Sequence, residues 1–319
     1  MRNEGPFIVE WVCWYRMLGF EILVVTNDCT DHSPALLNAL AKAGWLTHDT
    51  HKPRDGQPPQ KSAHRKIMNV PVTAQADWTL ICDVDEFLVL HDHDTIADYM
   101  GPPPHDFMAI AFNWKCFGTG DRDRYADGFV HRQFRRCGMG HLAINRSIKS
   151  IIRNPQMFER FGAHFPHGFR GDHAAPENAV RTASGQSLPQ FRAPENHPIR
   201  MVAQDQIDHE SAQMNHYILR SHDSYTMKKG TPSAAGFVDR YTDAFFERYN
   251  RNGMRDVSAL RFKDRFDAVH AQAMALPDVR RLHHLCCAEY VVALNDHAGT
   301  DPEGDARYQH HINKATKAI

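Results

Sequence analysis

Residues 78–90 read Trp-Thr-Leu-Ile-Cys-Asp-Val-Asp-Glu-Phe-Leu-Val-Leu. The mostly apolar run at residues 78–82 is followed by two aspartates, Asp83 and Asp85, with one residue between them. A short run of this kind is typical of a strand buried on both faces of a parallel sheet. Because alternate residues of an extended chain point to the same side, Asp83 and Asp85 can face one ligand at the end of the strand. Paired carboxylates suit Mg²⁺ or Mn²⁺, which completes its coordination with substrate phosphates and water. The stretch therefore predicts a metal site, although Asp-x-Asp alone also occurs in solvated acidic turns.

The chain before this stretch alternates between helical and strand patterns. Residues 8–18 are apolar nearly all round and predict a buried helix that ends before a glycine. Residues 20–26 predict a strand, and residues 34–43 and 61–76 predict helices. Strands joined by helical crossovers predict an α/β fold with an open, mostly parallel sheet and helices on both of its faces.

The predicted sheet places two acidic clusters where a ligand would bind. In open α/β sheets, ligands bind beyond the carboxyl ends of the strands, and Asn27-Asp28 and the Asp83-Val-Asp-Glu86 cluster follow the two predicted strands. Such a sheet normally opens with a strand, yet residues 2–5 read like the loop after one. We therefore expect that the first strand is missing and that the chain is truncated at its N-terminus.

The rest of the chain changes from strands to helices. Strands are expected over residues 107–117, 129–136 and 144–152, and residues 153–198 are rich in Pro, Gly, His and Asn and are expected to be irregular. Helices are expected over residues 221–229, 237–248, 259–275 and 278–296, with a polar tail after them. We accordingly divide the chain into an α/β domain (residues 1–232) and a helical C-terminal region (residues 233–319).

Composition and charge exclude several classes of protein. The 319 residues carry 37 Lys and Arg against 38 Asp and Glu, a net charge of −1 that gives no electrostatic basis for binding nucleic acid or an anionic membrane. No apolar stretch approaches the ~20 residues that a membrane-spanning helix needs, and no signal peptide is recognisable. The 7 cysteines form no Cys-x-x-Cys pair, so that neither a disulfide framework nor a zinc knuckle fits. We expect a cytoplasmic location.

Several motifs stand in an order that resembles a known family. They include Arg-Asn-Glu-Gly-Pro-Phe at residues 2–7, Asn-Asp-Cys-Thr-Asp at 27–31, Asp-Val-Asp-Glu-Phe-Leu at 83–88, Trp114, Lys-Ser-Ile-Ile-Arg at 149–153, Asn-His-Tyr at 215–217, Arg-Ser at 220–221 and Lys-Lys-Gly at 228–230. This order resembles the family 2-type glycosyltransferases and, more narrowly, the family 92-like branch, whose signature includes an Asp-x-Asp-Glu-Phe core. The resemblance covers residues 2–232 and implies that the domain of residues 1–232 binds the nucleotide sugar and is catalytic. One departure is His32, which stands where the relatives usually have the glycine of Asp-Gly-Thr.

The resemblance implies a GT-A fold, a nucleotide-diphosphate sugar donor, a glycan or lipid-linked hydroxyl acceptor, Mn²⁺ or Mg²⁺, and inversion at the anomeric carbon. The residues that match donor-binding positions are Asn3 and Glu4 beside the nucleotide, Asn27 and Asp28 at the base or ribose, and Lys61 or Arg65 near the diphosphate. The metal ligands implied are Asp83, Asp85 and His216. The predicted catalytic residues are Asp83, Asp85, Glu86 and Asp172.

Inverting transfer also needs a base that takes the proton of the acceptor hydroxyl. Four carboxylates are candidates, namely Asp172, Glu177, Asp208 and Glu210. Two other functions remain open at this point. A phosphohydrolase of the haloacid dehalogenase type also carries Asp-x-Asp after an apolar strand, although it usually has Thr or Val where Phe87 stands. A non-catalytic protein that binds a nucleotide sugar or a glycan would retain the same acidic pair.

Overall fold

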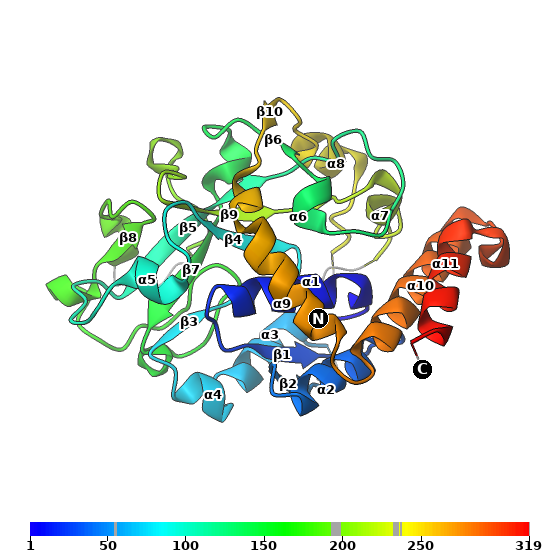
Figure 1. Cartoon of the computed structure of the whole chain (residues 1–319). Coiled ribbons are helices and arrows are strands. Elements are labelled where there is room, and N and C mark those ends of the chain that lie inside the picture. Colours follow the sequence, from blue (N-terminus) through cyan, green and yellow to red (C-terminus); the bar gives the residue numbers. More distant parts are fainter. Residues whose placement is uncertain (54–55, 193–198, 232–235, 237, 319) are drawn as a thin grey trace.

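The computed structural model (Figure 1) describes residues 1–53, 56–192, 199–231, 236 and 238–318. The helices in this part of the chain are α1 (Gly5–Met17), α2 (Ser33–Lys42), α3 (Pro59–Ile67), α4 (Pro71–Ala74), α5 (Ile96–Met100), α6 (Val130–Gln133), α7 (His222–Thr226), α8 (Asp243–Tyr249), α9 (Lys263–Met274), α10 (Val279–Ala298) and α11 (Ala306–Thr316). The strands are β1 (Leu23–Thr26), β2 (Thr47–Thr50), β3 (Trp78–Leu80), β4 (Glu86–Leu90), β5 (Ala109–Cys116), β6 (Arg136–Cys137), β7 (Ile148–Arg153), β8 (Val180–Thr182), β9 (Ala212–His216) and β10 (Met254–Arg255).

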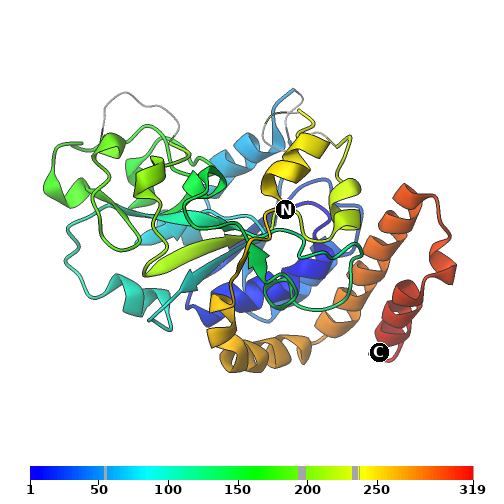
Figure 2. The same cartoon turned by 90° about the horizontal axis from the view of Figure 1, so that it is seen from above.

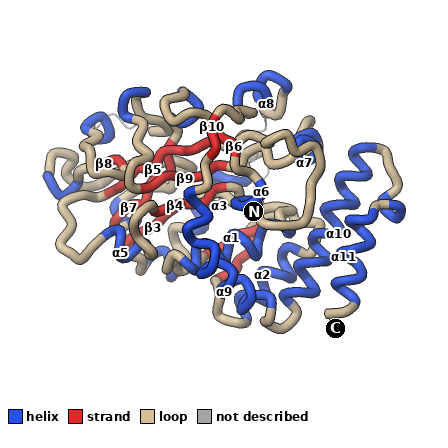
Figure 3. Tube along the Cα trace, turned by 45° about the horizontal axis from the view of Figure 1, so that its top comes forward, coloured by secondary structure: helices blue, strands red, loops and turns tan. Residues whose placement is uncertain are grey.

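The main sheet is mixed, and the expectation of a mostly parallel sheet is therefore wrong. Its strands follow the order β3-β7-β5-β9-β4, with β8 on the edge of β5. The β5–β9 and β5–β8 pairs are parallel, whereas the β3–β7, β5–β7 and β4–β9 pairs are antiparallel. The physical reason is that a parallel pair of consecutive strands needs a long crossover connection, usually a helix. In the described chain no long helix follows β5 or β7, so that neighbouring strands run in opposite directions. In the described residues β1 pairs with β2 alone, in a separate parallel sheet (Figure 1), whereas the strands of the main sheet are labelled together in Figure 3.

The topology brings the acidic stretch across one end of the main sheet. β3 and β4 lie at opposite edges of the strand order, yet residues 81–85 are all that joins them. Six peptide steps span at most roughly 20 Å, and four strand intervals take up about 19 Å. Residues 83–86 also form a turn, in which the Glu86 N–H donates to the Asp83 carbonyl (3.1 Å), so that the connection is not fully extended. The sheet must therefore curl so that its two edges approach each other. The directions of the strands place the end of β9 and the start of β7 at the same end.

Both faces of the sheet are covered, but by different kinds of structure. On one face, Ile110, Phe112 and Ile151 belong to a large core that also contains most of α1. On the other face, Ala109 and Ile152 pack against phenylalanines of the segment that follows β7, among them Phe158, Phe161, Phe165 and Phe191. This segment is mostly irregular, as expected, and it takes the place of the helices predicted for that face.

The central helix is α1, which was correctly predicted as a buried helix. Every one of its residues except Arg16 is buried. Its two indole N–H groups donate to the main chain of the acidic stretch, from Trp11 Nε1 to the Asp83 carbonyl (3.0 Å) and from Trp14 Nε1 to the Leu88 carbonyl (2.8 Å). The helix thus fixes the position of residues 83–88 directly.

The C-terminal helices pack against the helices of the first hundred residues. α9 and α10 both contact α1, and α10 also contacts α2. Figure 2 shows α10 and α11 side by side, far from the main sheet. A Cβ on Gly5 would lie 2.4 Å from Cys286 Cβ, so that α10 can approach the start of α1 only because residue 5 is glycine.

Several element predictions need correction. Residues 129–136 were expected to form a strand and instead form α6 with the short strand β6 after it, and β2 and α11 were not expected. The strand β3 is half-buried rather than buried on both faces. The start of the helix expected over 237–248 and the domain boundary at 232/233 lie outside the described residues. Within the described residues, none of the helices combines the length and the apolarity that crossing a membrane requires.

Candidate active site

The first aspartate of the motif is held by a buried lysine. Lys149 Nζ, near the start of β7, lies 3.0 Å from Asp83 Oδ2 and 2.8 Å from Glu86 Oε2. The Asp83 N–H also donates to Glu86 Oε2, at 2.7 Å. The side chains of Lys149 and Glu86 are almost completely buried, whereas that of Asp83 is 54% exposed. The Asp83 side chain therefore extends toward solvent, and the buried side chains of Glu86 and Lys149 hold it from beneath.

The charges of this group follow from burial and contact. Burial alone would lower the pKa of Lys149, but Asp83 and Glu86 raise it, so that the side chain remains an ammonium. Partial removal from water would raise the pKa of Asp83, but the Lys149 ammonium outweighs this effect and holds the pKa of Asp83 well below its usual range. Complete burial raises the pKa of Glu86 to about 8. Asp83 thus carries the exposed negative charge of the group, and Glu86 does not reach solvent.

The second aspartate faces a histidine. Asp85 Oδ1 lies 3.7 Å from Nε2 of His216, the last residue of β9, and the Asp85 carbonyl accepts a hydrogen bond from the Tyr217 N–H (2.8 Å). The pKa of His216 is lowered to about 4, chiefly by burial, so that the ring is neutral near pH 7. Burial would raise the pKa of Asp85, but His216 and the cations Lys228 and Arg220 lower it. Asp85 is therefore a carboxylate with three basic neighbours.

Trp114 of β5 forms a wall beside this histidine. The centres of the Trp114 and His216 rings are 4.0 Å apart. The Trp114 indole nitrogen is buried and has no hydrogen-bond partner among the described residues, and the same is true of His216 Nδ1. Buried polar atoms without a partner are uncommon in folded proteins and call for an explanation such as a ligand or an ordered water.

A buried arginine that helps to lower the pKa of Asp85 is bound to the N-terminal loop. Arg220 Nη1 lies 2.9 Å from Glu4 Oε2, and its guanidinium carbon lies 3.4 Å from the centre of the Phe7 ring. Its Nε and Nη2 atoms are buried without a hydrogen-bond partner among the described residues. The backbone of Arg220 has φ +57°, a left-handed conformation that costs a non-glycine residue about 1–3 kcal/mol. Strain of this kind persists where the surrounding structure holds a side chain in a required position.

The helix before the motif reaches the site through a residue that was not predicted. Lys61 and Arg65 of α3 are both exposed. His64, between them, is buried and lies near enough to Asp83 and Lys149 to be affected by their charges. Burial lowers the pKa of His64 to about 4, so that its ring is also neutral.

The remaining predicted donor-binding residues lie in the loops beside β1 and α1. Asn3 is exposed, with φ +52°, and bonds the N–H and hydroxyl of Thr30 (2.8 and 2.9 Å). Asn27 donates to Asp28 Oδ2 (3.2 Å), and Asp28 is exposed with φ +46°. The two loops are therefore joined to each other, and both keep polar side chains at the surface.

The four candidate bases are not joined to Asp83 or Asp85 by any contact in the described part of the chain. Asp172 is exposed and accepts the Ala174 N–H (2.8 Å) within its own turn. Asp208 Oδ2 accepts a hydrogen bond from the Ser184 N–H, and Asp208 Oδ1 accepts one from the Glu210 N–H (2.9 Å), so that both carboxylate oxygens bind the main chain of neighbouring loops. Glu177 and Glu210 are exposed. The assignment of Asp172 as a catalytic residue stays a prediction.

The residues present fit a divalent cation in part. Asp85 Oδ1 and His216 Nε2 approach each other closely enough, at 3.7 Å, to share one ion. Asp83, Asp85 and His216 are not among the three-residue sets of ligand atoms that lie within 4.8 Å of one another in the described chain. Mg²⁺ and Mn²⁺ are commonly held by one or two protein ligands together with substrate phosphates, so that two ligands suffice here.

Comparison with known families decides the class of protein. The sequence model of glycosyltransferase family 92 matches residues 3–229, which include the whole site described above. The chain belongs to glycosyltransferase family 92. Comparisons with curated proteins and with solved structures returned no match. The recognition of this family from the order of motifs is confirmed, and the family match favours a glycosyltransferase over a phosphohydrolase.

The site of this family 92 glycosyltransferase contains residues to which the sequence analysis gave no role. They are Lys149, Arg220, Lys228, Trp114 and His64. The first four stand within motifs that carried the resemblance, so that their place in those motifs was the available signal. His64 had no such signal. His32, the departure from the family pattern, has φ −75° and therefore needs no glycine, and its side chain instead pairs with Glu289 of α10 at 2.5 Å.

Proposed function

We propose that this family 92 glycosyltransferase transfers a sugar from a nucleoside-diphosphate donor to a hydroxyl acceptor, with inversion, on a GT-A-type site that uses Mn²⁺ or Mg²⁺. The observation that carries the proposal is the environment of Asp85. This carboxylate lies 3.7 Å from the neutral imidazole of His216 and within the electrostatic influence of Arg220 and Lys228. Carboxylate, imidazole and cations around one point suit a metal-bound diphosphate better than they suit a neutral sugar alone.

The cations of the site would neutralise the leaving group. As the glycosidic bond to the donor breaks, the nucleoside diphosphate departs with added negative charge on its terminal phosphate. Arg220 offers two buried N–H-bearing nitrogens that no described residue uses, and the Lys228 ammonium lies near enough to lower the pKa of Asp85. An arginine fork is well suited to bind two phosphate oxygens at once.

The metal ligands of the proposal are Asp85 and His216, with Asp83 as the third ligand. A bound Mn²⁺ or Mg²⁺ supplies further neutralisation of the diphosphate. Asp83 is oriented outward by the Lys149 ammonium and by its backbone bond to Glu86. We accordingly give Glu86, which is fully buried, a positioning role in place of contact with the substrate.

The acceptor would attack in a single displacement. Its hydroxyl oxygen forms a bond to the anomeric carbon while the bond from that carbon to the diphosphate oxygen breaks, and the hydroxyl proton passes to a base. Trp114 beside His216 provides an apolar wall and an unused indole N–H, which suit a sugar ring and its hydroxyl groups.

A thermal-shift panel tests the proposal. The protein is heated with each common nucleoside diphosphate, with and without Mn²⁺. A ligand at 100 times its Kd stabilises the folded state by about 2.7 kcal/mol, so that one nucleotide together with Mn²⁺ should raise Tm by several degrees. The matched variants are Asp85→Asn, which should lose the shift, and Asp92→Asn, an exposed neighbour that should keep it.

The alternatives predict different results in the same panel. Stabilisation by phosphate analogues without a nucleotide would favour a phosphohydrolase. A nucleotide shift that is unchanged in Asp85→Asn would refute the proposed site. A protein that only binds the nucleotide sugar would show the shift and release no nucleoside diphosphate from any donor.

A further inference from the structure

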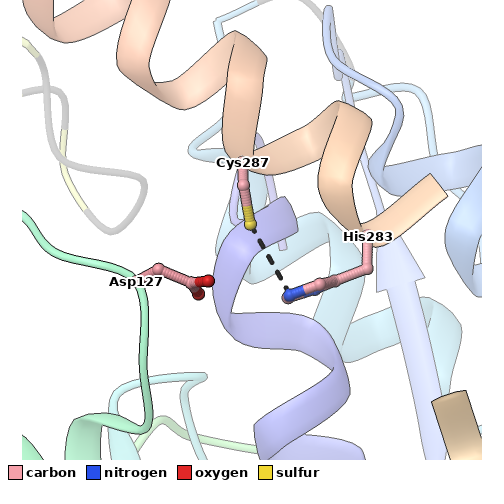
Figure 4. Close-up of side chains that lie close together, drawn as sticks. All are labelled: Asp127, His283 and Cys287. Atoms are coloured by element: carbon pink, nitrogen blue, oxygen red, sulfur yellow. Dashed lines mark hydrogen bonds between the residues drawn. The ribbon is translucent and has the colours of Figure 1, made fainter. Parts of the chain in front are cut away.

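A second group of ligating side chains lies where the C-terminal helices meet the loop between β5 and α6. Figure 4 shows the Asp127 carboxylate pointing toward His283 and Cys287, which both project from α10. The ligand atoms of these three residues all lie within 4.8 Å of one another. Cys287 is buried, His283 is half-buried and Asp127 is exposed. None of the three was singled out by the resemblance to the glycosyltransferases, and two of them lie beyond residue 229, where the family match ends.

The arrangement of the two α10 residues fits a metal ion. His283 and Cys287 are four residues apart and therefore share one face of the helix. The distance from Cys287 Sγ to His283 Nε2 is 3.6 Å. A tetrahedral zinc ion with Zn–S of about 2.3 Å and Zn–N of about 2.0–2.1 Å separates its sulfur and nitrogen ligands by ~3.6 Å. The pair thus already has the spacing of two zinc ligands, although a thiol–imidazole hydrogen bond alone would also account for that distance.

The third and fourth positions are available from two other segments. Asp127 approaches from the loop, and because it is exposed its carboxylate is free to close on an ion. The same Asp127 belongs to a second set with His310 and His311 of α11, and His310 Nε2 lies 4.0 Å from Asp127 Oδ2. His310 therefore lies beside the Asp127 carboxylate and is a candidate for the fourth ligand.

We propose that Asp127, His283 and Cys287 bind one zinc ion, with an α11 histidine or a water as the fourth ligand. Mixed nitrogen, sulfur and carboxylate ligands suit zinc and exclude Mg²⁺ and Ca²⁺, which prefer oxygen. On binding, the thiol of Cys287 loses its proton to solvent, and the sulfur bonds the ion as a thiolate. The site differs in chemistry from that around Asp85.

The zinc site would fasten the C-terminal helices to the catalytic part of the chain. The loop that carries Asp127 is already bound to α11 by Arg307, which donates to the Tyr125 carbonyl (3.0 Å). α10 in turn pairs with the loop before α2 through Glu289 and His32. An ion at Asp127 would join the loop, α10 and α11 at one point, which is the role of a structural zinc site.

Cobalt spectroscopy on the full-length protein tests this proposal. Co²⁺ added to metal-free protein should give the near-ultraviolet charge-transfer band of a cobalt–thiolate bond. Oxygen and nitrogen ligands give no such band, so that binding at Asp83 and Asp85 does not interfere. The band should disappear in Cys287→Ala and persist in Cys29→Ala. Asp127→Ala should weaken Co²⁺ binding at least about tenfold, and Asp123→Ala, an exposed aspartate of the same loop, should leave it unchanged.

Hydrogen exchange gives a second readout that does not depend on activity. Zinc should slow exchange of the α10 and α11 amides in the wild-type protein and have no effect in Asp127→Ala. Because Asp127 is exposed, this variant is expected to fold even if Cys287→Ala does not. A wild-type protein without the thiolate band, or a band that survives in Cys287→Ala, would overturn the proposal. So would equal Co²⁺ affinities of the Asp127→Ala and Asp123→Ala variants.

Discussion

Lys149 Nζ lies 2.8 Å from Glu86 Oε2, and both side chains are almost completely excluded from solvent. The contact joins the start of β7 to the start of β4, two strands that are not neighbours in the sheet. The same ammonium reaches Asp83 Oδ2 at 3.0 Å. One buried cation thus holds the acidic stretch in place where it crosses the end of the sheet.

The first prediction concerns the removal of this cation. Lys149→Met leaves Glu86 buried without its partner and Asp83 without its counter-charge. Breaking a buried pair costs roughly 3–5 kcal/mol. The free energy of unfolding in urea should fall by about 3 kcal/mol, at the low end of this range, because Glu86, whose pKa burial raises to about 8, is mostly protonated near pH 7 and leaves no full charge buried. Donor turnover should fall as well, since Asp83 loses its orientation.

A charge-matched control separates this effect from the loss of any lysine. Lys263→Met removes a side chain that is 59% exposed and pairs with Asp264 and Asp267 on the surface of α9. Pairs of this kind contribute little to stability. Equal destabilisation by the two substitutions would contradict the role given to Lys149. In addition, Glu86→Gln combined with Lys149→Met should be less destabilised than Lys149→Met alone.

The second prediction concerns mild acid. Burial lowers the pKa of His64, His164 and His209 to about 4, from an ordinary value of 6.5. A histidine with a lowered pKa in the folded state contributes its full stability above pH 6.5 and loses it as the pH falls through 4. The loss amounts to as much as about 3 kcal/mol for one histidine. The free energy of unfolding, measured in urea at pH 7, 5.5 and 4.5, should therefore fall steeply.

Substitution of one histidine isolates this contribution from that of the carboxylates. His164 Nδ1 bonds the Ile148 carbonyl at 2.9 Å. His164→Gln should reduce the slope of stability against pH, whereas the exposed His297→Gln should leave the slope unchanged. A slope that is the same in all three proteins would show that the buried histidines already accept protons in the folded state.

The sequence predicted α1, β1 and α2, but neither β2 and β4 nor how the strands pair. Apolar periodicity located α1 and α2, because both helices bury a face against the core. The same signal could not reveal that Phe87–Leu90 is a strand with the opposite direction, since a short apolar run carries no direction. The crossing of residues 81–85 from one edge to the other follows from the strand order, which is a property of the whole sheet.

The site was predicted better where a residue belongs to a local motif. Asp83 and Asp85 stand out in the sequence, and the structure places His216 beside Asp85. His64 could not be found in this way, because the exposed Lys61 and Arg65 of the same helix carry charges that appear better suited to a diphosphate. Which face of α3 turns inward is set by its packing, and this segment has few apolar residues to indicate that face.

The third prediction concerns Arg220. Arg220→Lys keeps the charge but loses the planar fork, which binds Glu4 and leaves two nitrogens free. A lysine at this position cannot bind a carboxylate and a phosphate in the same geometry. The KM for the donor should rise at least about tenfold, the equivalent of one lost charge-assisted hydrogen bond.

The control for this prediction is Arg280→Lys, at an exposed position of α10. Its KM should equal that of the wild-type protein. If Arg220→Lys also leaves the KM unchanged, the guanidinium does not contact the donor, and its contact with Glu4 is purely structural.

The central claim is that Asp85 lies at the point where the donor's diphosphate leaves. The most direct measurement is the release of nucleoside diphosphate from a panel of nucleotide sugars, with Mn²⁺ and with chelator, by the wild-type, Asp85→Asn and Asp92→Asn proteins. The account predicts that one donor is turned over with Mn²⁺, that chelator abolishes this turnover, and that only Asp85→Asn loses at least about 100-fold in rate, or some 2.7 kcal/mol of transition-state stabilisation. Turnover by Asp85→Asn at the wild-type rate would contradict the account.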